Sequence, residues 1–422
     1  MKIFSDLHKK GFFDLLSVNF LTQALGFGSL LLVAKFLTPN EFGQIKLIQS
    51  YASVFILIAG FGFNTAVLKL CSEKRQQAEK EGILKRSTLN TLVATLLALA
   101  LLGFLVLTDV ITSSKEIGFW LLVYSIGIPF AAITGLFTTY LQALKKIKEM
   151  ARAQALVRVQ SVSLIVVSTW LWGFEGFILS TILAYIVGLY PILKQVGFGF
   201  VRADASNLLP SNYMHIASFS FTANILAAIG MSTDVFILDH FSTDRSTIGY
   251  FSLATIFVLG AMQVTGTVQA IATPYFSERG FDESWVRQKI LETQFKMAGL
   301  SVVIALLIYF LAWLTISYYY GESYVIVLSY LSILLLKYVI YSSCAVIGVA
   351  LVGLGLMRYN LMVVAISTPI GFFFSYTLFL QHGALGVAWA QVWSAVLLFV
   401  LVIIISRIAL RAHFSKLIDA KL

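Results

Sequence analysis

Several charged side chains stand inside long apolar stretches of this sequence, where ionisable groups are uncommon. Five of them are considered as functional candidates: Lys35, Lys46, Asp234, Asp239 and Lys337. If these stretches cross a membrane, each such residue is expected to face a cavity or an opposite charge, because an isolated charge in a bilayer is costly. The basic residues outnumber the acidic ones, which favours an anionic ligand.

Lys337 has the most distinctive surroundings. Tyr330, Lys337 and Tyr341 stand at i, i+7 and i+11, on one face of a helix. With about twelve residues before it in its apolar stretch, Lys337 would lie ~18 Å deep, near the middle of a bilayer. A cation between two phenols could bind an anionic or sugar group. Alternatively, Lys337 pairs with a carboxylate or a backbone carbonyl and serves packing.

The other four charges also allow two interpretations. Lys35 and Lys46 flank one short polar turn and could attract a pyrophosphate, or could extend to the membrane surface. For Arg158, near the inner end of its stretch, the second interpretation is preferred, although Arg158 could also form an inner vestibule for a lipid headgroup with Arg152 and Lys148. Asp234, with Asp239 nearer the end of the same stretch, could act in ion coupling or gating. A pair between Asp234 and Lys35 would suit a latch that holds an inward-open state, and a purely structural ion pair is the alternative.

Uncharged polar side chains recur in two apolar stretches at helical spacing. Asn19 and Gln23 are four residues apart, as are Ser220 and Asn224. Such residues could bind sugar hydroxyls, but they also hold transmembrane helices together, at ~0.6 kcal/mol each.

The composition requires an apolar solvent besides the protein core. Of the 422 residues, 59% are hydrophobic and 12% charged, and the mean hydropathy is +0.88. Soluble domains are about 45–50% apolar and about 25% charged. The two cysteines, Cys71 and Cys344, form no metal-binding pattern, and no nucleotide-binding or hydrolase motif occurs. We therefore expect a membrane protein with no metal, no cofactor and no enzymatic activity.

Apolar segments long enough to span a bilayer, about 20 residues each, occur twelve times. They lie near 11–37, 43–68, 88–108, 118–142, 153–172, 177–196, 215–239, 248–276, 295–319, 325–352, 359–380 and 385–406. Strands of a membrane barrel would be about half as long and alternate in polarity. The sequence therefore predicts an all-α membrane protein of about twelve transmembrane helices.

The distribution of basic residues predicts the orientation. With the N-terminus inside, 25 of the 30 Lys and Arg residues fall on the cytoplasmic side, as positively charged loops do. Both termini are then cytoplasmic. The net charge of +10 is explained by this topology, so no nucleic-acid partner is expected. Every outer loop is short, so any function must be carried out within the bilayer.

Two stretches half a chain apart indicate an internal duplication. Residues 33–43 and 237–249 each end an apolar segment, pass through a short polar turn and begin the next segment at an apolar-Gly step. The predicted halves, 1–210 and 211–422, contain six spans each and are parallel repeats. In transporters of this plan the substrate site lies between the halves, around a central cavity.

The stretch Lys-Phe-Leu-Thr-Pro-Asn-Glu-Phe-Gly at 35–43 resembles the first-hairpin signature of bacterial polysaccharide flippases, in the multidrug/oligosaccharidyl-lipid/polysaccharide (MOP) exporter superfamily. Asp234 and Gly-Tyr-Phe-Ser-Leu-Ala at 249–254 resemble the matching pattern of the second half. The resemblance implies translocation of undecaprenyl-diphosphate-linked, O-antigen-type units from the cytoplasmic to the periplasmic leaflet. It further implies a bacterial inner-membrane location, contact with membrane lipid, and a polysaccharide polymerase and chain-length machinery as partners.

Two other functions are considered. A cation-coupled multidrug or metabolite antiporter of the same superfamily is expected to have an acidic cavity, whereas the charges inside these spans lean basic. A membrane-embedded polysaccharide polymerase is expected to carry a large outer loop, which this sequence lacks. The flippase is therefore the leading hypothesis.

Overall fold

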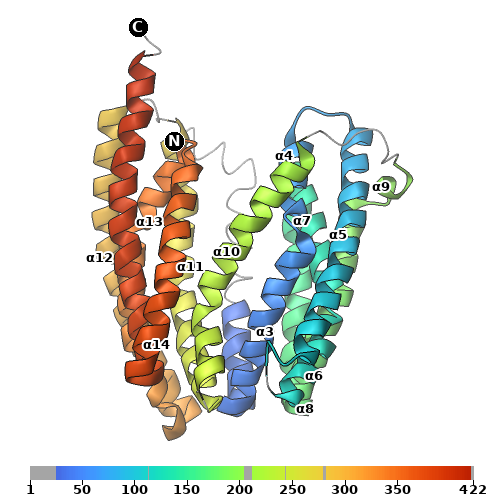
Figure 1. Ribbon diagram of the computed structural model, residues 1–422, viewed down its shortest axis with the longest axis vertical. Coiled ribbons are helices and arrows are strands. Elements are labelled where there is room, and N and C mark those ends of the chain that lie inside the picture. The colour runs from blue at the N-terminus through green and yellow to red at the C-terminus, as the bar shows by residue number, and fades with distance from the viewer. Residues whose placement is uncertain (1–24, 113, 204–211, 243, 279–281, 420–422) are drawn as a thin grey trace. The chain divides into compact units, whose positions relative to one another are not determined.

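The computed structural model describes residues 25–112, 114–203, 212–242, 244–278 and 282–419 (Figure 1). Within these ranges the chain is helical and contains no strand. It divides into two compact units, Met1–Ala228 and Ile229–Leu422, called unit 1 and unit 2 below.

Unit 1 begins with the apolar helix Leu25–Phe36 and continues through six labelled helices, drawn in blue to green in Figure 1. These are α3 (Pro39–Gly60), α4 (Phe63–Ser72), α5 (Gln77–Leu107), α6 (Lys115–Ser125), α7 (Ile128–Ala143) and α8 (Ile147–Val196), followed by the short α9 (Gly199–Arg202). A buried apolar cluster from α4, α5, α7, α8 and the start of α10 forms its core.

Unit 2 contains most of the later helices. They are α10 (Tyr213–Phe241), α11 (Ser246–Glu278), α12 (Glu283–Thr315), α13 (Ile326–Gly353) and α14 (Met357–Asp419), with a π-helical turn Ile316–Tyr320 and a 3-10 turn Glu322–Tyr324 before α13. α13 packs against α11, α12 and α14, so it is the central helix of this unit.

The boundary between the compact units falls inside α10. The first half of α10 packs on α4 and α5: Phe221 stacks on Phe61 with ring centroids 4.6 Å apart, and the Tyr213 hydroxyl lies 2.9 Å from Ser87 Oγ. The two compact units are defined by packing, whereas the predicted halves 1–210 and 211–422 are defined by the expected duplication of the sequence. The division into these two halves stays a prediction.

The spans agree with the hydropathy pattern. The described residues contain eight helices long and apolar enough to cross a membrane, and a ninth if α6 and α7, bent by 42°, form one span. α8 and α14 are each two helices joined at a break, at Trp172–Gly173 and at Gly383. With Leu25–Phe36 as the described part of the first span, the predicted number of about twelve is reached. The all-α membrane fold is confirmed.

The breaks in α8 and α14 are the same hairpin built twice. Gly173 has φ +57° and Gly383 has φ +58°, a left-handed conformation that favours glycine. Three residues later, a Cβ on Gly176 would overlap the carbonyl oxygen of Ser168, and a Cβ on Gly386 would overlap that of Leu378. Each hairpin joins the last two predicted spans of its half of the chain. This shared position supports an internal duplication.

The first-hairpin signature is in large part a helix-start signal. Thr38 caps α3: its Oγ1 accepts from the Glu41 N–H at 3.3 Å, while a Glu41 carboxylate oxygen accepts from the Thr38 N–H at 2.8 Å. Pro39 occupies the first turn, where its missing N–H is not needed. Because this capping box fixes the start, α3 begins at Pro39 and not at the predicted 43.

Other helix ends also extend beyond the apolar segments. The predicted polar loop 69–86 is helical from Gln77, so Lys80 and Lys85 stand on α5. Hydropathy detects the part of a helix that lies in hydrocarbon, and a helix that continues into the aqueous region carries polar residues there.

Candidate functional site

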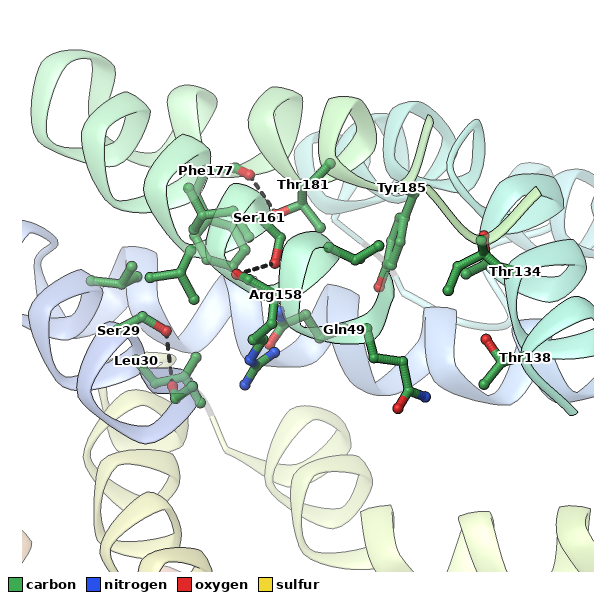
Figure 2. A pocket seen from close by; sticks show the side chains of 18 of the residues that line it. Ser29, Leu30, Gln49, Thr134, Thr138, Arg158, Ser161, Phe177, Thr181 and Tyr185 are labelled. Carbon is green, nitrogen blue, oxygen red and sulfur yellow. Dashed lines mark hydrogen bonds between the residues drawn. The ribbon is translucent and has the colours of Figure 1, made fainter. Parts of the chain in front are cut away.

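Unit 1 contains a cavity of about 590 Å³, within the size range of small-molecule sites. Its walls come from Leu25–Phe36, α3, α7 and both arms of α8 (Figure 2). The two arms of α8 contribute together because the hairpin at Gly173 folds them against each other, with Val157 close to Gly188.

Two basic side chains line this cavity. Lys46 of α3 donates a hydrogen bond to Gln49 Oε1 at 3.3 Å, and its Nζ lies 5.3 Å from the centroid of the Phe42 ring. Arg158 of α8 reaches the cavity from the opposite wall. A Cβ on Gly26 would overlap the Arg158 guanidinium, so an alanine at this position would require the end of the arginine side chain to shift.

Figure 2 shows Arg158 at the middle of the cavity, between Ser29 and Leu30 on one side and Gln49 on the other. The uncharged polar residues of the lining are Ser29, Gln49, Thr134, Thr138, Gln154, Ser161, Thr181 and Tyr185. Among the described residues, none that lines the cavity is acidic.

The hydroxyls of the lining are arranged to accept hydrogen bonds. Ser29 Oγ donates to the Gly26 carbonyl at 2.8 Å, Ser161 Oγ to the Arg158 carbonyl at 3.0 Å, and Thr181 Oγ1 to the Phe177 carbonyl at 2.7 Å. Each hydroxyl therefore donates its proton to a carbonyl of its own helix, and its oxygen lone pairs can accept a hydrogen bond from another donor. These hydroxyls, together with the amides, suit a ligand that carries its own hydroxyl groups.

One lining hydroxyl has no protein partner. Thr134 Oγ1 is buried, and no hydrogen bond is formed to it within the described part of the chain. On the same side, the hydroxyls of Tyr124 and Tyr185 lie 3.4 Å apart with their rings edge to face. A buried polar atom without a partner costs free energy unless a bound molecule or water satisfies it. Thr134 thus marks a place for a polar ligand group.

In unit 2, Lys337 donates a hydrogen bond to Gln391 Oε1 of α14 at 2.5 Å. Asp234 of α10 is buried, with 7% of its surface exposed, and accepts a hydrogen bond from the Val235 N–H at 2.9 Å. Asp234 and Lys337 attract each other electrostatically, although each has a different direct partner. The structure therefore brings two of the predicted residues into one charged group.

The two tyrosines predicted beside Lys337 have different surroundings. Tyr330 is buried against Phe251 of α11, with ring centroids 5.6 Å apart. Tyr341 lines a cavity of about 320 Å³ with Gln269 and Asn360, and neither Lys337 nor Tyr330 is among the residues that line it. The shared ligand site predicted for the three residues stays a prediction.

The remaining predicted residues are placed as follows. Lys35 is exposed near the end of Leu25–Phe36, and Asp239 is half-buried near the end of α10. Asn224 is exposed and donates to Ser220 Oγ at 3.3 Å, and Ser220 Oγ lies 2.6 Å from Thr65 Oγ1 of α4. Asn224 thus belongs to a polar link between α10 and α4. Asn19 and Gln23 lie outside the described residues.

Of the two interpretations of Arg158, the structure favours the one that the sequence ranks second. The side chain lies against Gly26 and lines the cavity, and does not extend to the membrane surface. The earlier start of α8 at Ile147 does not explain this, because the added residues include Lys148, Glu149 and Arg152. The difference lies in the direction of the side chain, which turns toward Gly26. A basic residue followed by polar residues at i+3 could have indicated the cavity.

Residues 8–279 match the family described as polysaccharide biosynthesis protein. The match covers more than half of the chain, which therefore belongs to this family. No curated protein matches the sequence.

Solved structures show the same fold at low sequence identity. The lipid II flippase MurJ in an inward closed conformation has a TM-score of 0.76 and 16% identity, over 96% of this chain and 89% of that chain. An inward-facing multidrug resistance MATE family transporter of the MOP superfamily has a TM-score of 0.72 and 15% identity, over 93% and 95%. A MOP superfamily transporter from Pyrococcus furiosus, described as having a binding pocket of reverse polarity, has a TM-score of 0.65 and 15% identity, over 96% and 93%. The chain has the fold of the MOP transporters, as predicted.

Proposed function

We propose that this protein is a flippase for lipid-linked oligosaccharides, and that the cavity of unit 1 receives the headgroup of its substrate. The observation that carries the proposal is the charge of the cavity. Lys46 and Arg158 line it, and none of the described residues that line it carries a carboxylate. Membership of the polysaccharide biosynthesis protein family supports a substrate of this class, as does the fold shared with the lipid II flippase.

The two basic residues suit the two parts of a diphosphate. The planar guanidinium of Arg158 can donate two parallel hydrogen bonds to one phosphate, and the ammonium of Lys46 acts as a point charge for the other. The hydroxyl and amide groups of the lining would hydrogen-bond the sugar. No bond of the substrate has to be broken, so the protein acts by binding and by alternating access and not as an enzyme.

The finer identity of the substrate follows from the resemblance of the sequence. We propose an undecaprenyl-diphosphate-linked repeat unit of O-antigen type, moved from the cytoplasmic to the periplasmic leaflet of a bacterial inner membrane. Both termini are then cytoplasmic. A polysaccharide polymerase and chain-length machinery would act on the product outside.

A second candidate is a cation-coupled antiporter. The observation that favours it is the buried carboxylate Asp234, which could exchange a proton or sodium ion in unit 2. A carrier of cationic drugs would benefit from an acidic cavity, whereas the cavity of unit 1 is basic. We therefore assign Asp234, with Asp239, to coupling or gating in a flippase.

The test is deletion of the gene, extraction of lipid-linked sugars and complementation. We expect lipid-linked repeat units to accumulate in the deletion strain and to be cleared by the intact protein but not by Lys46→Gln together with Arg158→Gln. Lys115→Gln is the matched control, because Lys115 is exposed at the start of α6 and lies outside the cavity lining. Normal surface polysaccharide with altered drug sensitivity would instead identify the antiporter.

A second pair of variants tests the cavity without removing a charge. Gly26→Ala pushes the Arg158 guanidinium from its place, while a Cβ on Gly28 meets no atom within 4 Å. We expect Gly26→Ala to slow clearance of the lipid-linked sugar about tenfold and Gly28→Ala to leave it unchanged, with equal amounts of both proteins in the membrane. Equal clearance by the two variants would contradict the proposed role of Arg158.

A further inference from the structure

Unit 2 has a groove of about 810 Å³ that is separate from the cavity of unit 1. α12 and α14 both pack along α13 but do not pack closely on each other, so α13 forms the floor and the two other helices form the walls. Leu291 and Phe295, on the α12 wall, are 57% and 77% exposed. In a membrane this groove therefore opens toward lipid.

The groove is apolar along most of its length. The α12 wall runs from Arg287 to Ala298, and the α14 wall runs from Leu410 back to Val396. The two walls span eleven and fourteen residue steps, which is ~16 Å and ~21 Å along the helix axes. These lengths are about half and about two-thirds of the hydrocarbon core of a bilayer, ~30 Å thick. The groove therefore fits a chain that reaches across one leaflet.

Both charged residues of the described lining are arginines, and both lie near the same end of the groove, with Leu410 one turn beyond Arg407. α12 begins and α14 ends on the side that the sequence predicts to be cytoplasmic, so Arg287 and Arg407 stand at the cytoplasmic surface. Arg287 forms an ion pair with Glu283 at 2.7 Å. Arg407 is exposed and forms no ion pair within the described residues. This end of the groove thus carries an uncompensated positive charge.

We propose that this groove binds an acidic phospholipid of the cytoplasmic leaflet. The phosphate lies at Arg407 and one acyl chain lies between α12 and α14 on α13. Ser406 and Gln294, which also line the groove, supply polar contacts for the glycerol region. A polyprenyl chain that is several times longer than the groove would leave most of its length outside, so the length favours an ordinary phospholipid over a carrier lipid.

The test is native mass spectrometry of the full chain in detergent, titrated with phosphatidylglycerol or with phosphatidylcholine. We expect the protein to bind phosphatidylglycerol tightly and phosphatidylcholine with lower affinity. Arg407→Gln is expected to lower the affinity for phosphatidylglycerol about fivefold. This factor corresponds to ~1 kcal/mol for one basic residue at an anionic lipid surface. Arg411→Gln is the matched control, because Arg411 is exposed one turn further along α14 and does not line the groove.

A second variant separates lipid binding from charge. Ala298→Trp fills the inner end of the groove and should displace the phosphatidylglycerol while the thermal unfolding of the protein stays cooperative. Equal binding by Arg407→Gln and Arg411→Gln, or equal affinity for the two phospholipids, would overturn the proposal. Undecaprenyl phosphate that displaces phosphatidylglycerol at a lower concentration would also overturn it, and would make the groove a carrier-lipid site.

Discussion

Asp234 and Lys337 place opposite charges inside one unit of a membrane protein, and their attraction can serve stability, transport or both. Neither uses the other as its direct hydrogen-bond partner: Lys337 donates to Gln391, and Asp234 accepts from a backbone N–H. Removing one charge leaves the other without compensation, which is costlier than removing both. The two roles can therefore be separated by comparing single and double variants.

We expect Asp234→Asn and Lys337→Gln each to lower thermal stability in detergent. The double variant should be more stable than the sum of the single effects predicts, by ~1 kcal/mol, because the two sites are coupled. If the pair also takes part in coupling or gating, the double variant should stay defective in clearing lipid-linked sugar. Full clearance by the double variant would assign the pair to stability alone, and full clearance by Lys337→Ala would remove Lys337 from the site.

For single residues, the sequence indicates which ionisable side chains are candidates for a function. It does not indicate which of them lie close to one another. The sequence allows Lys46 either to bind an anion or to extend to the membrane surface, and favours the membrane surface for Arg158. The structure places both residues in the lining of one cavity. Lys337 and Asp234 are singled out separately in the sequence, and only the structure shows that the two interact electrostatically. The depth of a residue in a membrane can be estimated from its position along one helix. Whether two side chains are in contact depends on how both of their helices are rotated about their axes.

Among the elements, the break between α3 and α4 carries the most constrained glycine. Gly62 has φ +70°, and a Cβ there would overlap the carbonyl oxygen of Ala217 on α10. The same break stacks Phe61 on Phe221. The break is thus the point at which α10 docks on unit 1.

We expect Gly62→Ala to destabilise the protein by more than ~1 kcal/mol, since a left-handed alanine alone costs ~1–2 kcal/mol and the overlap with α10 adds to it. Gly60→Ala, two residues earlier and with no atom within 4 Å of the added Cβ, should be neutral or slightly stabilising. Thermal unfolding of the two variants in the same detergent measures the difference. Equal stability would show that α10 does not depend on this close approach.

The paired hairpins of α8 and α14 make a second prediction for the elements. Gly176→Ala and Gly386→Ala each force a backbone contact apart, so we expect each to destabilise its unit by ~1–3 kcal/mol, as overpacking does. Gly103→Ala in α5, where the added Cβ meets no atom within 4 Å, is the control. Similar losses in the two hairpins, measured by thermal unfolding, are expected if they are duplicated elements. A loss in one hairpin only would count against equivalence.

Hydropathy predicted the elements better than it predicted their ends. The predicted segments 153–172 and 177–196 correspond to the two arms of α8, because a Gly-containing turn interrupts the apolar pattern at Gly173. The start of α5 at Gln77 could not be predicted from apolar residues, since its first turns are polar. The capping box at Thr38 was readable in the sequence, but it was interpreted as a family signature and not as the start of a helix.

For the whole molecule, the transport cycle proposed above requires a fixed orientation in the membrane. The substrate headgroup must enter from the side on which it is made, and the acidic phospholipid must face the arginines of unit 2. Both requirements depend on which surface carries the basic residues. The sequence predicts that surface from the 25 Lys and Arg residues that share one side.

The orientation can be tested with single cysteines at the two ends of α5. Lys74 is exposed between α4 and α5, and Lys115 is exposed at the start of α6. α5, which spans 31 residues or ~46 Å, lies between them, so the two positions belong to opposite sides of the membrane. The native Cys71 and Cys344 are both buried and would first be replaced by serine.

With a membrane-impermeant thiol reagent on intact cells, Lys115→Cys should be labelled and Lys74→Cys should be labelled only after the membrane is opened. The physical reason is that segment 69–86 carries six basic residues, which are retained in the cytoplasm, whereas the α5–α6 connection carries only Lys115. Labelling of both positions after the membrane is opened is the control for accessibility. Labelling of Lys74→Cys in intact cells would reverse the orientation, and with it the side from which the cavity of unit 1 is loaded.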